Sequence, residues 1–429
     1  MEKLTDVNKL VPTIDEEVKS ILHQLEQPIT RFGEGPGERR ERLIELVSSD
    51  EKARNAMIKL QESSSDDLMS DLDNEEFYTP GTDDVFQIRS SIADDSLRRA
   101  QRRVLGQHQL YTTTDPLENL KSRRAYYKGL KSCLQLEGSQ IVSNRFTSAV
   151  QFSPDDSLIA AASWNGSCYI YDSKTLDLKH TFKDLLSEKV SALDWMPDST
   201  AKRLATGGAA GKIKLVDLEN RSDGELDGHQ GRITDVQFHP ICKYLCSSSY
   251  DLTWRLWDLE KMQEIYYQEG HSKELTVLKI HPDGSLLASA GLDAMVRVWD
   301  LRTGRSIAVL SNNGHIKAVH AMDWRPSGFQ LITGGADNNL KVWDLRKSNS
   351  SAAETVLAHS KMITDVKVAS NDKYFVSCGY DGYLDVISCD NFVTIKKFKN
   401  IDKLMTCDVS HDSKRIITGG WDRSLKLYQ

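Results

Sequence analysis

Three sets of a histidine, a hydroxyl side chain and an aspartate recur along the C-terminal part of the chain. They are His229, Ser247 and Asp251, then His271, Ser289 and Asp293, and then His315, Thr333 and Asp337. An imidazole between a hydroxyl and a carboxylate is the arrangement that serine hydrolases use for nucleophilic attack. Because the set recurs at a regular interval, we instead predict buried polar networks and a chain that is not an enzyme.

The regular interval comes from an internal repeat of seven segments. Their last residues are Asp172, Asp217, Asp258, Asp300, Asp344, Ser388 and Gln429. A period of roughly 40–45 residues with a Trp-Asp ending resembles the four-stranded blade of a WD40 propeller. Alternating apolar and polar residues within each copy, as in Val296–Trp299, mark a strand with one buried face. The sequence therefore predicts an all-β seven-bladed propeller over 132–429, preceded by a mainly α-helical N-terminal arm.

The resemblance to WD40 repeats implies that each set forms a tetrad with the tryptophan that ends the blade. These tryptophans are Trp257, Trp299 and Trp343. Blades one, two, six and seven depart from the pattern at Asn165, Ala210, Ile387 and Tyr428. We expect these four blades to depend more on apolar packing. Nothing follows the last copy, so Cys133–Val142 is predicted to supply the outer strand of blade seven and close the ring.

Four aromatic residues stand one position before the turn aspartate or its replacement. They are Trp164, Tyr250, Tyr380 and Trp421. In WD40 propellers this position opens on one rim of the ring. Ring closure makes blades seven and one neighbours, so Trp421 and Trp164 are expected side by side. Exposed aromatic residues favour partner binding, and the alternative is local packing under the rim loops.

Composition excludes several classes of protein. Hydrophobic residues make up 39% and charged residues 27% of the 429 residues, and the formal net charge is −7. No apolar run approaches the roughly 18 residues of a membrane helix, and the charged N-terminus argues against secretion. Seven cysteines without CxxC pairs indicate reduced thiols in an intracellular protein. The string His239, Cys242, Cys246 has no evident fourth ligand, so no metal site is predicted.

The N-terminal arm falls into three predicted parts. A helical region over 1–61 has a helix over Asp15–Leu25, a second helix from Pro36 and a third from Asp50. The glycine-rich turn Gly33–Gly37 follows a helix and lacks the Lys-Ser/Thr ending of a phosphate-binding loop, so no cofactor is expected. An acidic flexible linker is predicted over 62–94, since residues 62–84 hold acids and no Lys or Arg.

A basic helical segment is predicted over 95–131. One capped helix is expected from Asp95 to Gly106 and another from Asp115 to Lys131. Their candidate contacts with RNA phosphates or an acidic protein surface are Arg98, Arg99, Arg102, Arg103, Lys121, Arg123 and Arg124. The alternative reading is a solvated charged face.

One block before the propeller resembles the splicing factor motif. It runs from Glu26 to Leu43, and the residues that it offers for partner binding are Pro28, Ile29, Phe32, Gly33, Glu34, Arg39, Arg40 and Leu43. Two kinds of splicing factor share this motif, and one of them continues into a WD40 propeller. The chain therefore resembles the WD40-repeat proteins of the U4/U6 small nuclear ribonucleoprotein.

That resemblance implies a nuclear, non-enzymatic scaffold of the U4/U6 and U4/U6-U5 particles in pre-mRNA splicing. It implies a second U4/U6-specific protein and other tri-snRNP proteins as partners, near the U4/U6 RNA duplex. The short sequence before the motif and the short linker argue against cyclophilin binding. The alternative is a WD40 adaptor in another complex, such as a ubiquitin-ligase substrate receptor or a ribosome-assembly factor.

Overall fold

The structure of the protein is a computed structural model. It describes residues 18–19, 21–22, 25, 27–28, 35–49, 84–183, 185–186, 188–198, 202–218, 223–347 and 352–429. The chain divides into two compact units, Met1–Phe77 and Tyr78–Gln429. The predicted third helix from Asp50, and the linker up to residue 83, lie outside the described residues.

The first unit is built around helix α3, Pro36–Ser49, which begins at the predicted proline. Leu43 and Val47 lie one turn apart on this helix and are fully buried against Val18 and Leu22. These are the residues that the apolar stripes of the first two predicted helices provide. The cluster is small, as expected for a helical unit of this size.

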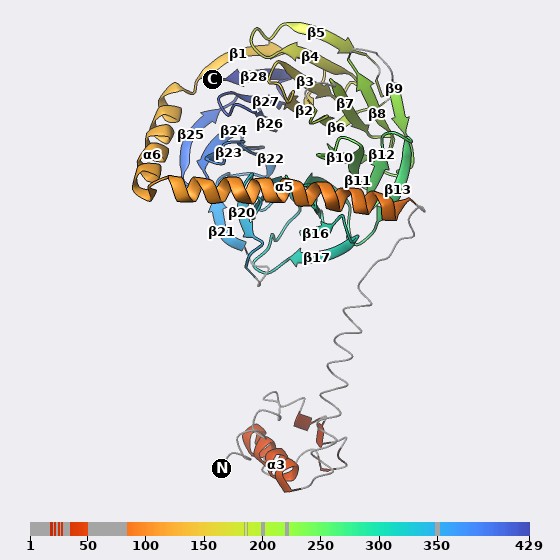
Figure 1. Cartoon of the computed structure of the whole chain (residues 1–429), viewed down its shortest axis with the longest axis vertical. Coiled ribbons are helices and arrows are strands. Elements are labelled where there is room, and N and C mark those ends of the chain that lie inside the picture. The colour runs from red at the N-terminus through yellow and green to blue at the C-terminus, as the bar shows by residue number, and fades with distance from the viewer. Residues whose placement is uncertain are drawn as a thin grey trace. The chain divides into compact units, whose positions relative to one another are not determined.

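The second unit contains seven four-stranded antiparallel sheets arranged around a ring (Figure 1). Its strands are β1 Leu136–Ile141, β2 Thr147–Phe152, β3 Leu158–Ser163, β4 Cys168–Asp172, β5 Leu178–Phe182, β6 Val190–Trp195, β7 Arg203–Gly208, β8 Ile213–Asp217, β9 Asp223–Leu226, β10 Ile233–Phe238, β11 Tyr244–Ser249, β12 Trp254–Asp258, β13 Gln263–Gln268, β14 Leu275–Ile280, β15 Leu286–Gly291, β16 Val296–Asp300, β17 Arg305–Leu310, β18 Val319–Trp324, β19 Gln330–Gly335, β20 Asn339–Asp344, β21 Ala352–Leu357, β22 Ile363–Val368, β23 Tyr374–Gly379, β24 Tyr383–Ser388, β25 Thr394–Lys399, β26 Leu404–Val409, β27 Ile416–Gly420 and β28 Ser424–Tyr428. The predicted seven-bladed propeller is confirmed.

Blade seven is completed by a strand from the other end of the propeller sequence. Strand β1 pairs antiparallel with β28, and the sheet order is β1-β28-β27-β26. The backbone N–H of Gln135 donates to the Gln429 carbonyl at 2.7 Å, and the N–H of Gln429 donates back at 2.9 Å. The stretch Cys133–Val142 therefore contains the closing strand that the sequence predicts.

Side chains join the first strand of each blade to the next blade around the central channel. These inner strands have one edge without a strand partner, so their N–H groups need other acceptors. The carboxylates of three inner strands accept from the following blade: Asp194 from Phe238 N at 2.7 Å, Asp323 from Val368 N at 2.7 Å, and Asp408 from Phe152 N at 2.8 Å. The last of these bonds crosses from blade seven to blade one and so reinforces the closure.

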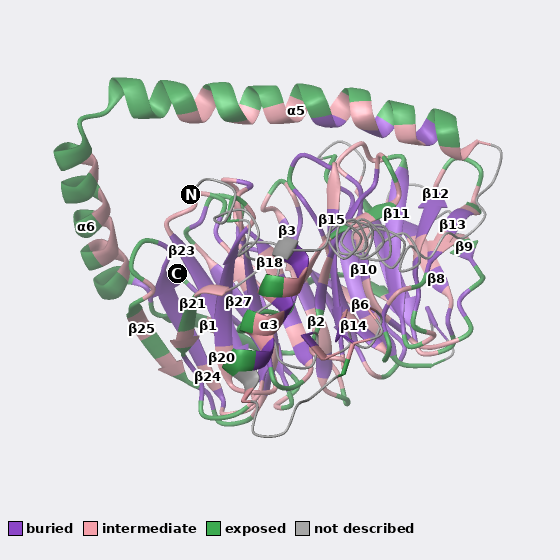
Figure 2. Ribbon diagram, turned by 90° about the horizontal axis from the view of Figure 1, so that it is seen from below, coloured by how far each residue is buried: buried purple, intermediate pink, exposed green. Residues whose placement is uncertain are grey.

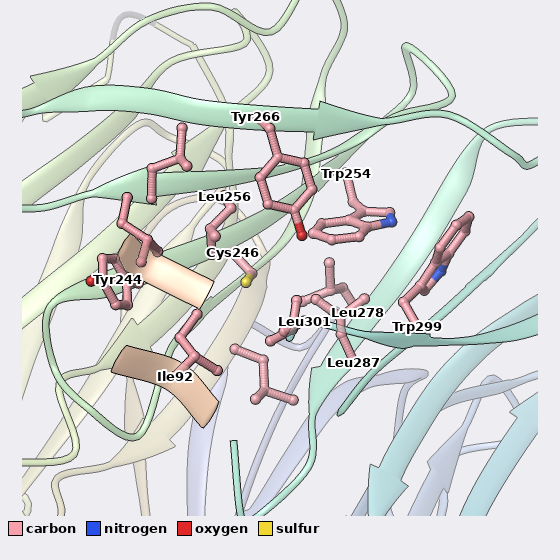
Figure 3. Packing of buried hydrophobic residues seen from close by; sticks show 13 residues of the cluster. Ile92, Tyr244, Cys246, Trp254, Leu256, Tyr266, Leu278, Leu287, Trp299 and Leu301 are labelled. Atoms are coloured by element: carbon pink, nitrogen blue, oxygen red, sulfur yellow. The ribbon is translucent and has the colours of Figure 1, made fainter. Parts of the chain in front are cut away.

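Helix α5, Val85–Thr113, lies along one face of the propeller (Figure 2). Ile88 and Ile92, one turn apart, enter an apolar cluster between blades three and four (Figure 3). The predicted linker over 62–94 is therefore wrong for residues 85–94, which are helical. The helix predicted over Asp95–Gly106 begins earlier, at Val85, and ends later, at Thr113. Docking of the first three turns stabilises the helix beyond its local propensity, and it runs through Gly106, which costs about 1 kcal/mol in a helix. None of the described helices is both long and apolar enough to cross a membrane.

Helix α6, Pro116–Cys133, begins as predicted, because the Asp115 carboxylate accepts from the Leu117 N–H at 3.1 Å. Its apolar face packs on the outer strands of blade six, and Leu134 directly after it is 1% exposed in the core of blades six and seven. This anchor fixes the chain where it enters the closing strand. Leu136, two residues on, is 53% exposed.

Replacing Leu134 with alanine tests the importance of this anchor. Leu134→Ala should lower the free energy of unfolding by about 2–5 kcal/mol, as for other buried leucines. Leu136→Ala is the matched control and should change it by less than about 0.5 kcal/mol. The measurement is urea unfolding of the whole chain. Equal effects of the two variants would show that the entry to the closing strand is not anchored.

Candidate functional site

The predicted tetrads of blades three, four and five form as chains of hydrogen bonds. In blade three, His229 Nδ1 lies 2.8 Å from Asp251, and its Nε2 lies 2.7 Å from the Ser247 hydroxyl. The indole N–H of Trp257 donates to the same hydroxyl at 2.8 Å. The corresponding distances are 2.8, 2.7 and 2.9 Å in blade four, and 2.9, 2.8 and 2.9 Å in blade five.

The geometry of the tetrads argues against a nucleophile. The hydroxyls of Ser247, Ser289 and Thr333 belong to residues that are 0% exposed. Each hydroxyl is engaged by an imidazole and an indole at once, so no space remains for a substrate carbonyl beside it. A buried network in which every member has a partner stabilises a fold, and that is the chemistry available here.

The tetrad carboxylates are held in the ionised form. Burial alone would raise the pKa of the Asp293 carboxyl, but hydrogen bonding from His271, the proximity of that imidazole and two backbone N–H bonds outweigh burial and lower it. The pKa values of Asp251 and Asp337, and of Asp381 at the corresponding turn of blade six, are lowered by the same kinds of contact. A carboxylate that accepts several hydrogen bonds is stabilised relative to its protonated form.

Blades six and seven contain polar networks that the sequence reading missed. In blade six, His359 bonds to Asp381 at 3.1 Å and to Ser377 at 2.9 Å, although Ile387 replaces the tryptophan. In blade seven, Lys426 bonds to Asp422 at 2.5 Å and to Asn400 at 2.9 Å, and the Tyr428 hydroxyl also reaches Asn400, at 3.1 Å. The prediction that these two blades rely more on apolar packing than on a tetrad did not include these networks, which are present in addition to the apolar clusters. The sequence feature that indicates the network of blade six is the Ala358-His359 pair. For blade seven it is a lysine in the last strand.

The aromatic residues of the rim are arranged around a residue that the sequence reading did not consider. Trp421 and Trp164 were predicted to lie side by side, but Phe146 lies between them. Phe146 stacks on Trp421 at a centroid distance of 4.8 Å and is tilted against Trp164 at 4.4 Å. Tyr380 meets Trp421 edge-on at 6.3 Å, while Tyr250 is 41% exposed. Phe146 precedes the first strand of blade one, a position without any motif to mark it.

The basic helices are divided between internal and exposed cations. Arg103 binds the buried carboxylate of Asp283 through two of its nitrogens and also donates to the Ser327 carbonyl. Arg99 donates to the Pro240 carbonyl at 2.9 Å, and Arg123 pairs with Asp390. These three arginines were predicted to contact RNA or an acidic surface, and instead they attach the helices to the propeller. Four other members of that set remain exposed: Arg98, Arg102, Lys121 and Arg124.

The motif residues that the structure describes have different roles. Leu43 is buried in the core of the first unit, so it packs internally and is not available as a partner contact. Arg39 is 5% exposed, and the carbonyl of the exposed Pro28 accepts from Arg42 at 3.0 Å. Arg40 is partly exposed. Ile29, Phe32, Gly33 and Glu34 lie outside the described residues.

The His-Cys string of blade three is used for packing. His239 Nε2 lies 2.8 Å from the Gly284 carbonyl, and its Nδ1 accepts from the Ile241 N–H at 3.2 Å. Burial lowers the pKa of this imidazole to about 4 and raises that of the Cys246 thiol above its usual range. Among the described residues, no group of three or more His, Cys, Asp or Glu side chains is arranged to hold a metal ion.

Acid should weaken the fold through the tetrad carboxylates. Their folded-state pKa values lie below the unfolded value of about 3.9, so their contribution is complete above that pH and is lost as the pH falls through the folded values. Asp293→Asn removes one such group and should reduce the loss of unfolding free energy between pH 5 and pH 3. The measurement is urea unfolding across that pH range. An unchanged pH dependence in the variant would contradict the assignment.

Reversing the charge of Arg103 should release α5 from the propeller. Arg103→Glu places a carboxylate beside the buried Asp283, so amide hydrogen exchange along α5 should become faster. Arg102→Glu alters the neighbouring exposed arginine and is the matched control, with exchange close to that of the unaltered chain. Equal protection in both variants would mean that the Arg103–Asp283 pair does not hold the helix.

Comparison with known proteins agrees with this arrangement. Residues 18–46 match the family model described as pre-mRNA processing factor 4 (PRP4) like, and residues 146–429 match the one described as the IFT122 first beta-propeller. The chain is 41% identical to the U4/U6 small nuclear ribonucleoprotein PRP4 of Saccharomyces cerevisiae over 435 residues, which cover 100% of this chain and 92% of that protein.

Two further relatives carry the same description. The chain is 36% identical to the human U4/U6 small nuclear ribonucleoprotein Prp4 over 197 residues, which cover 44% of this chain and 36% of that protein. For the PRP4-like protein of Arabidopsis thaliana the identity is 33% over 253 residues, 58% of this chain and 37% of that protein. With the motif, the propeller and a full-length relative in agreement, the chain belongs to the family of U4/U6 small nuclear ribonucleoprotein PRP4 proteins.

Proposed function

We propose that the protein is a non-catalytic scaffold of the U4/U6 and U4/U6-U5 small nuclear ribonucleoproteins in the nucleus. It holds partner proteins near the U4/U6 RNA duplex during pre-mRNA splicing. The observation that carries this proposal is the full-length similarity to the yeast U4/U6 protein, at 41% identity, which includes both the motif and the propeller.

The absence of catalysis in this proposal is supported by the tetrads. They are the residues of the propeller that most resemble catalytic machinery, and their hydroxyls are buried and doubly hydrogen-bonded, as in Ser247. The protein then functions through the surfaces that bind its partners. A rigid disc with helices attached suits the holding of several partners at fixed relative positions.

Three surfaces are available for partners in this proposal. The motif unit, with the exposed Pro28 and the partly exposed Arg40, binds the second U4/U6-specific protein. The exposed basic residues of α5 and α6, Arg98, Arg102, Lys121 and Arg124, contact RNA phosphates or an acidic protein surface of the particle. The rim aromatics Trp164, Tyr250, Tyr380 and Trp421 bind a further protein of the tri-snRNP.

Co-purification tests the assignment to the U4/U6 particle. The tagged chain, captured from nuclear extract, should enrich U4 and U6 RNA over U1 and U2 RNA, because a U4/U6 scaffold remains with its duplex. RNA sequencing of the captured material is the measurement. A capture without tag is the control.

Two outcomes would count against the splicing proposal. Equal recovery of all small nuclear RNAs would remove the particle assignment. Recovery of ribosomal precursors or of ubiquitin-ligase subunits in place of U4 and U6 would favour the adaptor function in another complex.

A further inference from the structure

Two side chains of each blade are placed next to each other on one face of the propeller. The backbone N–H of the residue before the turn aspartate donates to the carbonyl of the residue that precedes the inner strand. In blade one this bond joins Trp164 N to Phe146 O at 3.2 Å, and in blade three it joins Tyr250 N to Arg232 O at 2.9 Å. Every blade has the equivalent bond, so the two positions form two adjacent rings.

Cations and aromatic rings occupy eight of these ten positions in five consecutive blades, and the other two are Met362 of blade six and Ala209 of blade two. We call this group the cationic arc, and its members from blade six to blade three are Tyr380, Lys403, Trp421, Phe146, Trp164, Lys189, Arg232 and Tyr250. Lys403 lies 4.6 Å from the Trp421 centroid and 4.9 Å from that of Tyr380. Lys189 lies 4.5 Å from the Trp164 centroid, and Arg232 bridges Trp164 at 5.6 Å and Tyr250 at 5.9 Å.

The other two blades do not continue the pattern. Blade four has Glu274 and Leu292 at the same two positions, and blade five has Ala318 and Ala336. The arc is therefore confined to one side of the ring. A surface that is polarised in this way favours one orientation of a charged partner.

The arc lies on the face opposite α5. Strand β11 begins at Tyr244, whose hydroxyl is 3.2 Å from that of Ser91 in α5, and it ends at Ser249, beside Tyr250. A propeller strand runs from one face to the other, and α5 covers only the first face (Figure 2). The helix therefore leaves the arc open.

The cations of the arc are not neutralised within the described residues. Lys189, Arg232 and Lys403 take part in no ion pair there, and the buried Nε of Arg232 has no hydrogen-bond acceptor. The exposed Arg145 and Arg423 add positive charge beside Phe146 and Trp421, against the exposed Glu188 and Asp402. A set of cations without carboxylate partners is complementary to an acidic ligand.

The packing of the rings decides which acidic ligand fits. Single-stranded nucleic acid binds by stacking its bases on free aromatic faces. The faces of Trp421 and Trp164 are already taken by Phe146 and by lysine or arginine groups. The arc offers immobilised cations and ring edges, with Trp421 40% exposed, which suits carboxylates next to an apolar side chain.

We propose that the cationic arc binds an acidic segment of a partner protein, rich in Asp and Glu with an apolar residue between them. The carboxylates meet Lys189, Arg232 and Lys403, and the apolar side chain meets the exposed edges of Trp421 and Tyr250. Cations held against rings lose little freedom on binding, which favours affinity. This inference rests on the proposed scaffold function and names the chemistry of one of its partners.

The test uses the full chain and a short synthetic peptide that alternates Asp or Glu with Leu and Phe. Its controls are the same peptide with Asn and Gln, and a uridine oligonucleotide of similar length. The chain variants are Arg232→Glu with Lys403→Glu, and, as the matched control, Lys273→Glu with Lys317→Glu. The control lysines are exposed and stand near the same position of blades four and five, so both pairs change the net charge equally.

The acidic peptide should bind the unaltered chain at physiological salt, and the arc variant should bind it about tenfold or more weakly, as for the loss of charge pairs across an interface. The control variant should bind within about twofold, and the neutral peptide should bind neither form. Unchanged unfolding curves establish that both variants fold.

Three results would overturn the proposal. They are no binding of the acidic peptide, equal weakening by both variants, and arc-dependent binding of the oligonucleotide in place of the peptide. Capture of U4 and U6 RNA by the arc variant distinguishes a failure of the arc assignment from a failure of the scaffold function. If the peptide result fails while this RNA is still recovered, the arc assignment fails and the scaffold function stands.

Discussion

The inner edge of each blade imposes the constraint on which the propeller depends. A first strand has a neighbour on one side only, and the N–H groups on its other edge face the channel. Carboxylates of the preceding blade accept from them, as Asp408 does from Phe152. Burial at these positions raises the pKa values of Asp194 and Asp408 to about 6. Lys367 lies in the inner strand β22 of blade six, and the surrounding carboxylates raise its pKa although burial alone would lower it. The need of the inner-strand N–H groups for acceptors thus places carboxylates along the channel, and these carboxylates determine both its geometry and its charge.

Ring closure at the outer edge and the tetrads at the turns also make the propeller rigid. Strand β1 removes the free edge of β28 by pairing across the ends of the domain. The histidine of each tetrad ties the loop before a blade to the turn and central strand within it, as His229 does with Asp251 and Ser247. Blade six does so with His359, Asp381 and Ser377 but without the tryptophan, and blade seven uses Lys426, Asp422 and Asn400. The outcome is a stiff disc whose surfaces keep fixed positions.

The positively charged side chains on the two faces of the disc have different kinds of partner. On one face, arginines of α5 bind the propeller itself, and the central contact is the ion pair of Arg103 with Asp283. On the other face, Arg232 and Lys403 rest on aromatic rings and have no carboxylate partner among the described residues. A cation on an aromatic ring is not neutralised and can still pair with an anionic group of another molecule. A cation in an ion pair is already neutralised by its carboxylate. A scaffold with one covered and one open face can attach its own arm and a separate partner at once.

The sequence alone determined the seven blades, the closing strand and the tetrads, because a period of repeated residue types and a local turn encode them. It also determined the family resemblance through the motif block. The tertiary structure decided which arginines are free, since Asp283 lies far along the chain from Arg103 and no local pattern joins them. It also decided the length of α5, which packing of Ile88 and Ile92 extends past the helix predicted from caps. The position of Phe146 between two tryptophans likewise depends on blades one and seven meeting in space.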